Sequence, residues 1–252
     1  MNLRQEIMRL SVKYRFRQSH ALDQYFMADS GTIERIVRYA ELKPEDTVLE
    51  IGPGPGFLTR ELARKAGKVI AVEKDKRLEQ LLRTELSEFQ NIQFVFEDYL
   101  KANLPEYNKV VSNMPFSISA SALMKIMKES PELCVLTFQK EFAEKVLAAP
   151  GWHEYGPISV ITQYYYEGKI AEKVPRGYFH PMPKVDSAVL VLKRKKVPQD
   201  QGFEEFIKQV FRHPNKNISS VVQQYYSKEI NNNKKVRSLS PLELKGVYNQ
   251  VS

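Results

Sequence analysis

The 252-residue sequence contains a single cysteine, Cys134. One cysteine cannot form a disulfide within the chain and excludes a zinc site built on cysteines, and it indicates a reducing compartment or an inert, buried thiol. Apolar runs are also short. None approaches the roughly 20 residues that cross a bilayer as a helix, and the first residues lack the apolar region of a secretory signal. These absences predict a cytoplasmic protein without a membrane-spanning segment.

Charge is abundant but unevenly placed along the chain. There are 38 Lys and Arg against 30 Asp and Glu, which gives a formal net charge of +8. The positive excess lies in residues 1–20, 193–196 and 208–237, and the rest of the chain is net acidic. Such segments are typical of a protein that binds a polyanion such as nucleic acid, because neutralised phosphates release counterions. A set of solvated helix faces remains the alternative at this point.

Apolar segments of strand length alternate with helical patterns up to about residue 138. The patterns predict strands at residues 47–51, 69–72, 92–96, 109–112 and 133–138, with helices at 32–42, 57–65 and around Leu78 to Leu82. Strands separated by helices form right-handed βαβ units and a parallel sheet covered on both faces. The sequence therefore predicts an α/β fold, and residues 159–166 and 188–193 are predicted as extended segments late in the same sheet.

The pattern becomes purely helical after Pro198. Helices are predicted at 203–211 and 218–226, and Ser240-Pro-Leu-Glu243 opens a last helix as a capping box with proline in the first turn. We therefore predict a large domain at residues 1–197, with residues 1–22 as a basic N-terminal leader. Residues 198–252 are predicted to form a small helical domain.

The strongest local signal is the turn Glu50-Ile-Gly-Pro-Gly-Pro-Gly56, between a predicted strand and a predicted helix. Glycines at this place let the backbone pass close to a ligand and adopt dihedral angles that other residues resist. Gly52, Gly54 and Gly56 lack the G-x-G-x-x-G spacing of a dinucleotide site, and the two prolines remove amide donors that a phosphate would use. The turn therefore favours a ligand without phosphates.

Two acidic residues follow the next two predicted strands. Glu73 lies 21 residues after Gly52, where an acid binds the hydroxyls of a ribose, and Asp98 can accept a hydrogen bond from an adenine amino group. A glycine turn, a ribose acid and an adenine acid at successive strand ends predict an S-adenosylmethionine site at the topological switch point of the sheet. A tight turn with two solvated acids is the alternative.

The fourth predicted strand ends in the motif Asn113-Met-Pro-Phe116. An exocyclic adenine nitrogen is a poor nucleophile because its lone pair is delocalised into the ring. Its methylation therefore needs acceptors that draw the amine protons out of the ring plane and a surface that holds the base. The Asn113 side-chain carbonyl and the Met114 backbone carbonyl are the candidate acceptors, Phe116 is the candidate stacking ring, and Pro115 completes this candidate catalytic motif. A plain turn is the alternative.

These motifs resemble those of the ribosomal RNA adenine N6-dimethyltransferases of the KsgA/Dim1 type, archaeal members above all, and more distantly those of the Erm resistance methyltransferases. The resemblance covers nearly the whole chain. Its further motifs are Asp23-Gln-Tyr-Phe-Met27, Gln139-Lys-Glu-Phe-Ala143 and Phe179-His-Pro-Met-Pro-Lys-Val-Asp-Ser-Ala-Val189. It implies a Rossmann-like class I methyltransferase sheet with a small C-terminal helical domain, and S-adenosylmethionine as the cofactor.

The resemblance also implies roles for individual residues and a substrate. Tyr25 and Met27 would line the cofactor pocket, the residues in contact with the cofactor would be Gly52, Glu73, Asp98 and Asn113, and Phe116 and Phe179 would sandwich the target adenine. The implied substrate is a pair of adjacent adenosines in the 3′-terminal hairpin of small-subunit (16S) rRNA, each methylated twice during ribosome biogenesis. The implied partner is a precursor of the 30S subunit, with the chain acting as a monomer and without a metal.

Four residues depart from the family pattern. Asp23 stands in place of the usual glycine, Tyr25 in place of asparagine or histidine, Met27 in place of leucine, and Phe116 in place of the commoner tyrosine, whose stacking face it keeps. Two alternatives therefore stay open. One is a non-catalytic assembly factor of the small subunit on the same fold, and the other is an Erm-type enzyme that methylates 23S rRNA.

Overall fold

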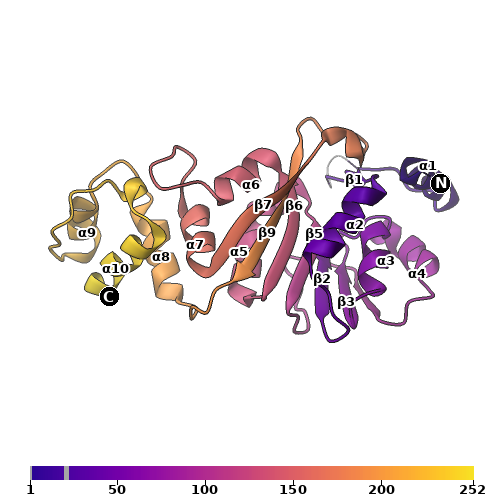
Figure 1. The fold of residues 1–252 in the computed structure, drawn as a ribbon, viewed down its shortest axis with the longest axis horizontal. Helices are drawn as coiled ribbons and strands as arrows, with labels where there is room; N and C mark the ends of the chain where they lie inside the picture. Colours follow the sequence, from indigo (N-terminus) through magenta and orange to yellow (C-terminus); the bar gives the residue numbers. More distant parts are fainter. Residues whose placement is uncertain (1, 20–22) are drawn as a thin grey trace. The chain divides into compact units, whose positions relative to one another are not determined.

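The computed structural model of the protein describes residues 2–19 and 23–252, which form two compact units (Figure 1). Unit 1 contains the residues up to 143 together with 169–193, and unit 2 contains residues 144–168 and 194–252. The sequence-based boundary at residue 198 differs from this division, which also assigns residues 144–168 to the C-terminal unit. The reason is that the helix at 157–165 packs against C-terminal helices.

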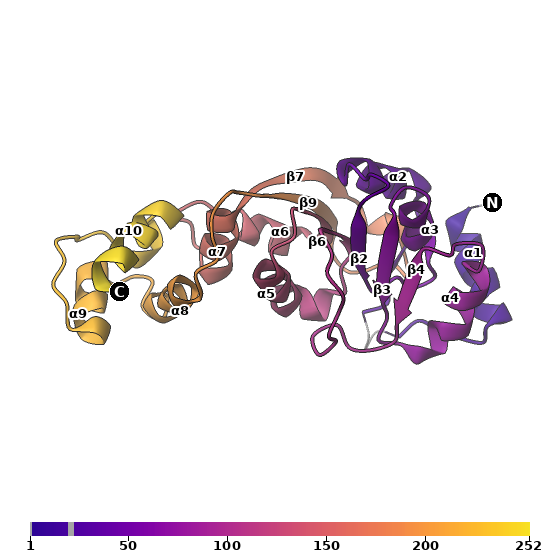
Figure 2. The same cartoon turned by 90° about the horizontal axis from the view of Figure 1, so that it is seen from below.

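A seven-stranded sheet organises the fold, and Figure 2 shows three of its strands, β2, β3 and β4, side by side. The strands are β2 Thr47–Ile51, β3 Lys68–Val72, β4 Ile92–Val95, β5 Lys109–Asn113, β6 Leu133–Gln139, β7 Tyr166–Val174 and β9 Ser187–Arg194. Their order is β4-β3-β2-β5-β6-β9-β7. Strands β2 to β6 pair in parallel and β9 pairs antiparallel with β6. The predicted parallel α/β sheet is therefore present.

The order in which the chain adds strands to the sheet reverses between β2 and β5, although these two strands run parallel. After β2 the chain continues outward through β3 and β4, and it then returns to the other side of β2 as β5. Loops at such a reversal diverge and leave a crevice outside the carboxyl ends of the strands. The four predicted cofactor contacts follow or end these four strands, so the topology alone brings them to one edge of the sheet.

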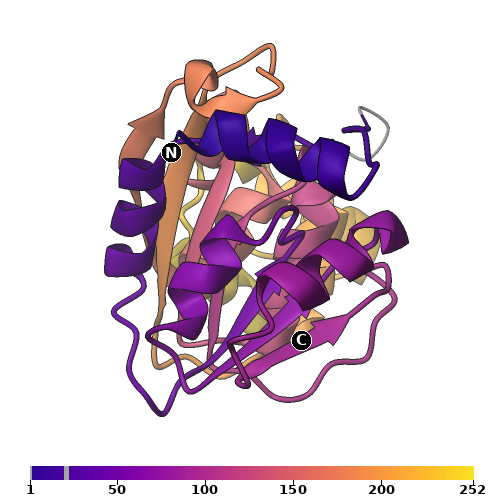
Figure 3. The ribbon, with the colours of Figure 1, turned by 90° about the vertical axis from the view of Figure 1, so that its right-hand side faces the viewer.

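The helices of the described residues are α1 Leu3–Lys13, α2 Ser30–Tyr39, α3 Phe57–Ala63, α4 Glu79–Glu85, α5 Ser119–Glu129, α6 Lys140–Val146, α7 Pro157–Tyr165, α8 Gln201–Val210, α9 Ile218–Tyr226 and α10 Pro241–Val251. In unit 1, α2 packs on α3 and α3 packs on β3, as Figure 3 shows from the side of that unit. A two-stranded ribbon joins β1 Phe26–Met27 to β8 Phe179–His180 in antiparallel pairing. None of the helices in the described part of the chain is long and apolar enough to cross a membrane.

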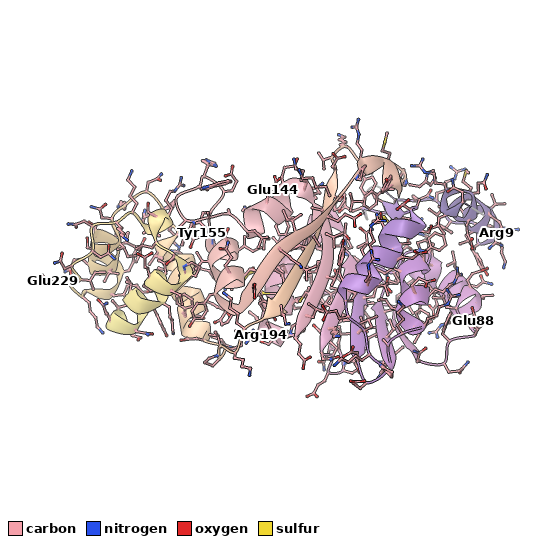
Figure 4. The ribbon with its side chains drawn as sticks, in the orientation of Figure 1. Arg9, Glu88, Glu144, Tyr155, Arg194 and Glu229 are labelled. Atoms are coloured by element: carbon pink, nitrogen blue, oxygen red, sulfur yellow. The ribbon has the colours of Figure 1, made fainter. Side chains whose placement is uncertain are left out.

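The predicted basic leader begins as helix α1, which belongs to unit 1, and its last residues, 20–22, lie outside the described residues. Ile7 and Leu10 are buried in the same hydrophobic cluster as α2 and α3. Arg9, labelled in Figure 4, and Lys13 form ion pairs with Glu85 of α4 at 3.6 and 2.7 Å. Two of the leader's cations therefore already have an internal partner, and the helix is part of the fold.

The prediction of an extended segment at 159–166 is wrong, because these residues form helix α7 up to Tyr165 and the strand β7 begins at Tyr166. The run is rich in β-branched residues, which favours a strand from sequence alone. Pro157 opens the helix, and the Ser159 hydroxyl accepts from the Gly156 backbone N–H and donates to the Lys145 carbonyl. Burial on several sides of α7 overrides the local preference. By contrast, α9 begins and ends where the sequence predicts it.

Candidate active site

A cleft in unit 1 lies at the carboxyl ends of β2, β3 and β5 and beside the loop that follows β4. It encloses about 850 Å³ of empty space, part of it open to solvent. Eight of the residues predicted from the sequence line it: Tyr25, Gly52, Glu73, Asp98, Asn113, Met114, Pro115 and Phe116. The structure therefore brings the predicted cofactor residues and the predicted catalytic motif into one cavity.

Two glycines let neighbouring segments approach the turn after β2. Gly52 has φ +72°, and a Cβ at this residue would lie 3.2 Å from Pro115 Cγ. Gly54 has φ +56°, and a Cβ there would lie 2.8 Å from the ring of Phe26. Both residues need a backbone conformation that side chains disfavour. The glycine turn thus fits against the catalytic motif on one side and against the segment 23–27 on the other.

Glu73 is buried at the end of β3 with both carboxylate oxygens held by backbone amides. Gly54 N–H donates to Oε2 at 3.2 Å, and Asp75 N–H donates to Oε1 at 2.8 Å. Burial raises the pKa of Glu73 to about 7, although these two hydrogen bonds act in the opposite direction. Each oxygen keeps acceptor capacity for one more donor. Two adjacent ribose hydroxyls would fit this arrangement.

Asp98 lies at the mouth of the same cleft and is a permanent carboxylate. Lys74 Nζ donates to Oδ2 at 2.9 Å and the Leu100 backbone N–H donates to Oδ1 at 3.0 Å. Lys74 in particular holds the pKa of Asp98 below its usual value. An ionised oxygen that still has acceptor capacity can receive a hydrogen bond from an adenine amino group.

The side-chain amide of Asn113 is oriented by the backbone of the segment opposite. Its Nδ2 donates to the Tyr25 carbonyl oxygen at 3.1 Å. Its Oδ1 is buried and has no hydrogen-bond partner among the described residues. Because the Tyr25 carbonyl can only accept, the amide cannot flip without losing this bond. A buried acceptor without a donor costs free energy, so Oδ1 is suited to a donor that arrives with a ligand.

The aromatic residues are arranged differently from the expected sandwich. Phe116 stacks on Tyr25, with ring centroids 5.6 Å apart and an interplanar angle of 22°. Phe179 exposes 0% of its surface and lies in β8, opposite Met27 of β1. Met27 itself lines a separate small cavity beside Glu50. The structure therefore brings Phe116 to the cleft and leaves Phe179 in the core, so a stacking role for Phe179 stays a prediction that requires β8 to move.

The structure shows two hydrogen bonds around this cleft that the sequence did not predict. Gln24 is buried and donates from Nε2 to Asp75 Oδ2 at 2.7 Å. The Ser117 backbone N–H donates to Asp23 Oδ2 at 2.7 Å. Gln24 lies inside a motif that carried the family resemblance, and Asp75 lies two residues after Glu73. Their proximity to recognised motif positions is the one signal in the sequence that pointed to them.

Glu50, the acid that opens the glycine turn, is buried at the end of β2. Burial raises its pKa to about 8, and the nearby Glu73 raises it further while the Thr59 hydroxyl lowers it. Its Oε2 has no hydrogen-bond partner within residues 2–19 and 23–252. Glu50 is therefore a neutral acid near pH 7, unlike Asp98.

We expect the substitution Glu50→Gln to stabilise the protein at pH 8 by roughly 4 kcal/mol and to have almost no effect at pH 4.5. A carboxyl whose pKa is raised by folding favours the folded state below its unfolded pKa, and this contribution is lost as the pH rises through about 8. Urea unfolding at the two pH values measures the difference. The exposed residue Glu88 (Figure 4) supplies the control Glu88→Gln, and equal effects of Glu50→Gln at both pH values would contradict the assignment.

The sheet order, the cleft at its switch point and the acids at the strand ends define a class I methyltransferase that uses S-adenosylmethionine. A dimethyladenosine transferase from Plasmodium falciparum has the same fold, with a TM-score of 0.77 and 24% identity over 88% of this chain and 96% of its own. The 23S rRNA methyltransferase ErmE superposes with a TM-score of 0.71 and is 31% identical, over 90% of this chain and 99% of that one. These similarities confirm the predicted fold class.

The family model described as ribosomal RNA adenine dimethylase matches residues 15–251. A probable ribosomal RNA small subunit methyltransferase A from Methanosarcina mazei is 40% identical in an alignment of 247 positions that covers 91% of each chain. This chain belongs to the ribosomal RNA adenine dimethylase family and is an S-adenosylmethionine-dependent methyltransferase. The family, the enzyme class and the cofactor predicted from the sequence are confirmed.

The side chains of the cleft suit this cofactor. The glycine turn offers a close backbone approach, Glu73 offers acceptors to a diol, and Asp98 offers one to an amine. The part of the chain that the structure describes holds no group of three or more His, Cys, Asp or Glu residues placed to bind a metal ion.

Proposed function

We propose that the protein transfers methyl groups to the N6 atoms of two adjacent adenosines in the 3′-terminal hairpin of small-subunit (16S) rRNA, two to each base. The observation that carries this proposal is the buried Oδ1 of Asn113, which has no hydrogen-bond partner in the described part of the chain and which the bond from Nδ2 to Tyr25 keeps directed as an acceptor. The choice of the small subunit is supported by the Methanosarcina relative, whose name specifies it.

In this proposal Asn113 Oδ1 and the Met114 backbone carbonyl accept hydrogen bonds from the N–H groups of the adenine N6 amine. These hydrogen bonds draw the amine protons out of the ring plane, so that the nitrogen lone pair is no longer conjugated with the ring. The lone pair can then be directed at the methyl carbon, in line with its bond to sulfur. The cofactor supplies a methyl group bound to a sulfonium sulfur. Transfer to N6 would leave the C–S bonding pair on the cofactor's sulfur, and the extra N6 proton would pass to water. No side chain has to act as a strong base.

We assign the other residues of the cleft by the groups they present. Glu73 takes the ribose hydroxyls, Asp98 takes the adenine amino group of the cofactor, and Gly52 lets the backbone approach it. Tyr25 and Met27 form the wall at the segment 23–27, with Met27 on the side of the smaller cavity. Phe116 stacks on the target base, and Pro115 fixes the turn that presents it.

Two neighbouring loops of unit 2 provide a surface for RNA phosphates. The Val236 N–H donates to the Lys216 carbonyl at 3.0 Å, and a bridge joins Asn217 to Lys235, so the loops at 211–217 and 231–237 lie side by side. The side chains of Arg212, Lys216 and Lys235 are exposed there. Such cations favour binding to phosphates by releasing counterions.

The basic run 193–196 contributes only part of its charge to such a surface. The Arg194 guanidinium lies over the rings of Tyr165 and Tyr166, with centroid distances of 5.3 and 5.4 Å. Lys195 Nζ donates to the Gln163 carbonyl at 2.7 Å. Lys193 and Lys196 are exposed and are the members of this run that we assign to RNA. We further propose that the protein acts as a monomer on a precursor of the 30S subunit in the cytoplasm.

Methyl transfer from labelled S-adenosylmethionine to 30S subunits that lack these methyl groups tests the proposed function. We expect four methyl groups per subunit, located by mass spectrometry in the 3′-terminal hairpin, and none on fully methylated 30S subunits. Transfer to 23S rRNA alone would instead support the Erm-type activity. Binding to 30S subunits without binding of the cofactor would support a non-catalytic assembly factor.

A further inference from the structure

The segment 23–25 makes two contacts with the residues that present the stacking ring. Asp23 Oδ2 accepts from the Ser117 backbone N–H at 2.7 Å. Tyr25 stacks on Phe116 at 5.6 Å between ring centroids. Ser117 and Phe116 belong to the short 3-10 turn Phe116–Ile118 that follows the catalytic motif. One short segment therefore holds both the ring and the turn that carries it.

The backbone of Asp23 adopts a conformation that favours glycine, so the aspartate side chain contributes something beyond backbone geometry. Asp23 has φ +49°, in the left-handed region where glycine is the least strained residue. Glycine at this position would leave the Ser117 amide without its carboxylate acceptor. The aspartate side chain therefore adds one contact that glycine could not make. This contact is the hydrogen bond from the Ser117 N–H, which caps the turn that carries Phe116.

The stack between Tyr25 and Phe116 also decides which ring face receives a base. A base inserted between the two rings would first have to break their direct stacking contact. The rings are 5.6 Å apart, so the base must use the opposite face of Phe116. Tyr25 then acts as a support behind Phe116.

The same segment is tied to the cofactor side of the cleft. Gln24 Nε2 donates to Asp75 Oδ2 at 2.7 Å, and the Asp75 N–H donates to Glu73 Oε1 at 2.8 Å. On the other side the Tyr25 carbonyl accepts from Asn113 Nδ2. A chain of hydrogen bonds thus runs from the acid assigned to the ribose to the residues assigned to the target base.

We propose that Asp23 and Tyr25 are positioning residues for the target adenine, which hold Phe116 ready to stack by capping its turn and supporting its ring. The inference rests on the proposed function, because it takes Phe116 as the surface for the base. In this inference the ring of Tyr25 supports the ring that stacks on the target base and does not contact the cofactor. The Tyr25 backbone carbonyl orients Asn113.

The pair of variants Asp23→Gly and Asp23→Asn tests the cap. Both tolerate the left-handed backbone, but Asn alone keeps an oxygen that can accept from Ser117. With under-methylated 30S subunits we expect Asp23→Gly to lower kcat/KM roughly fivefold, the loss of about one hydrogen bond, and Asp23→Asn to restore it to within about twofold of the wild type. The Kd for S-adenosylmethionine, measured by calorimetry, should stay nearly constant. Equal kcat/KM for the two variants would overturn the role of Asp23.

A double-mutant cycle between Tyr25 and Phe116 tests the support. We expect Tyr25→Ala to lower kcat/KM by roughly fivefold in the wild type and to have almost no further effect in the Phe116→Ala background, with Tyr25→Phe near the wild type. Weaker cofactor binding with unchanged use of RNA would overturn the proposal, and so would an equal loss in both backgrounds.

Hydrogen exchange at the Ser117 amide keeps this inference distinguishable from the proposed function. We expect faster exchange in Asp23→Gly than in Asp23→Asn, whatever RNA the enzyme methylates. If the wild type methylates 30S subunits and the two variants match it in kcat/KM, the inference fails and the proposed function stands. If the wild type methylates no 30S subunit, the proposed function fails and the assignment of Asp23 and Tyr25 to its target adenine fails with it, although exchange at Ser117 still reports the cap.

Discussion

Replacing Asn113 with alanine is expected to lower the turnover of adenine methylation by more than tenfold while leaving the affinity for the small subunit nearly unchanged. The substitution removes Oδ1, a buried acceptor that has no hydrogen-bond partner among residues 2–19 and 23–252, and it also removes the bond from Nδ2 to the Tyr25 carbonyl. An interaction made mainly in the transition state lowers kcat and kcat/KM together when it is lost. In the proposed function, RNA affinity depends instead on exposed cations elsewhere, such as Arg212 and Lys216.

Single-turnover methylation of under-methylated 30S subunits measures this effect, and filter binding measures the affinity. Asn108 supplies a matched control, because it precedes the opposite end of the same strand, β5. Its side chain bonds Thr47 N–H and Asp46, far from the catalytic motif in the strand. We expect Asn108→Ala to reduce stability and to leave turnover per folded molecule intact. A comparable loss of subunit affinity in Asn113→Ala would remove Asn113 from the catalytic role.

The parts of the site that could be predicted from sequence are those that sheet topology determines. In a parallel sheet with one reversal, residues directly after successive strands meet at one edge. Gly52 and Glu73 directly follow their strands, Asp98 lies three residues after β4, and Asn113 ends β5. Short apolar strands and the residues at their carboxyl ends were therefore enough to group these four. The parallel sheet itself was predictable because strands that are buried on both faces have continuous apolar sequences.

Contacts between segments far apart in the sequence were not predictable in this way. Asp23 and Ser117 are 94 residues apart, and neither local pattern indicates the hydrogen bond between them. The burial of Phe179 depends likewise on the pairing of β8 with β1. Helix α7 was misread because its sequence favours a strand and only its packing makes it a helix. In each case tertiary contacts decide what the local residues leave open.

The charge of a sequence segment also does not show which of its cations are exposed and free of other contacts in the fold. The run 193–196 reads as four equivalent cations, yet the structure engages Arg194 with two tyrosine rings and Lys195 with a backbone carbonyl. The leader reads as a basic arm, yet Arg9 and Lys13 pair with Glu85 of α4. Net charge in a segment therefore overstates the charge available to a polyanion, because some of the cations are already paired with an acid or held in contacts within the fold.

Glu73 gives the second large effect, a loss of cofactor affinity of roughly 10- to 100-fold in Glu73→Ala, as expected when two hydrogen bonds to a charged acceptor are removed. Its pKa of about 7 adds a pH dependence. The ionised carboxylate offers acceptors to both ribose hydroxyls, whereas the protonated form uses one oxygen as a donor. The affinity of the wild type for S-adenosylmethionine should therefore rise about tenfold from pH 6 to pH 8.

Calorimetry across this pH range separates Glu73 from the other acids of the cleft. Glu73→Gln should bind weakly at every pH and show no such rise, because the titrating group is gone. Asp98→Asn should bind more weakly but keep the rise, since Lys74 holds the pKa of Asp98 below its usual value and the residue stays ionised throughout. Glu50→Gln should keep it as well, because Glu50 has no place in the ribose contact. A flat profile in the wild type, or one flattened by Asp98→Asn, would show that Glu73 is not the acid that receives the ribose.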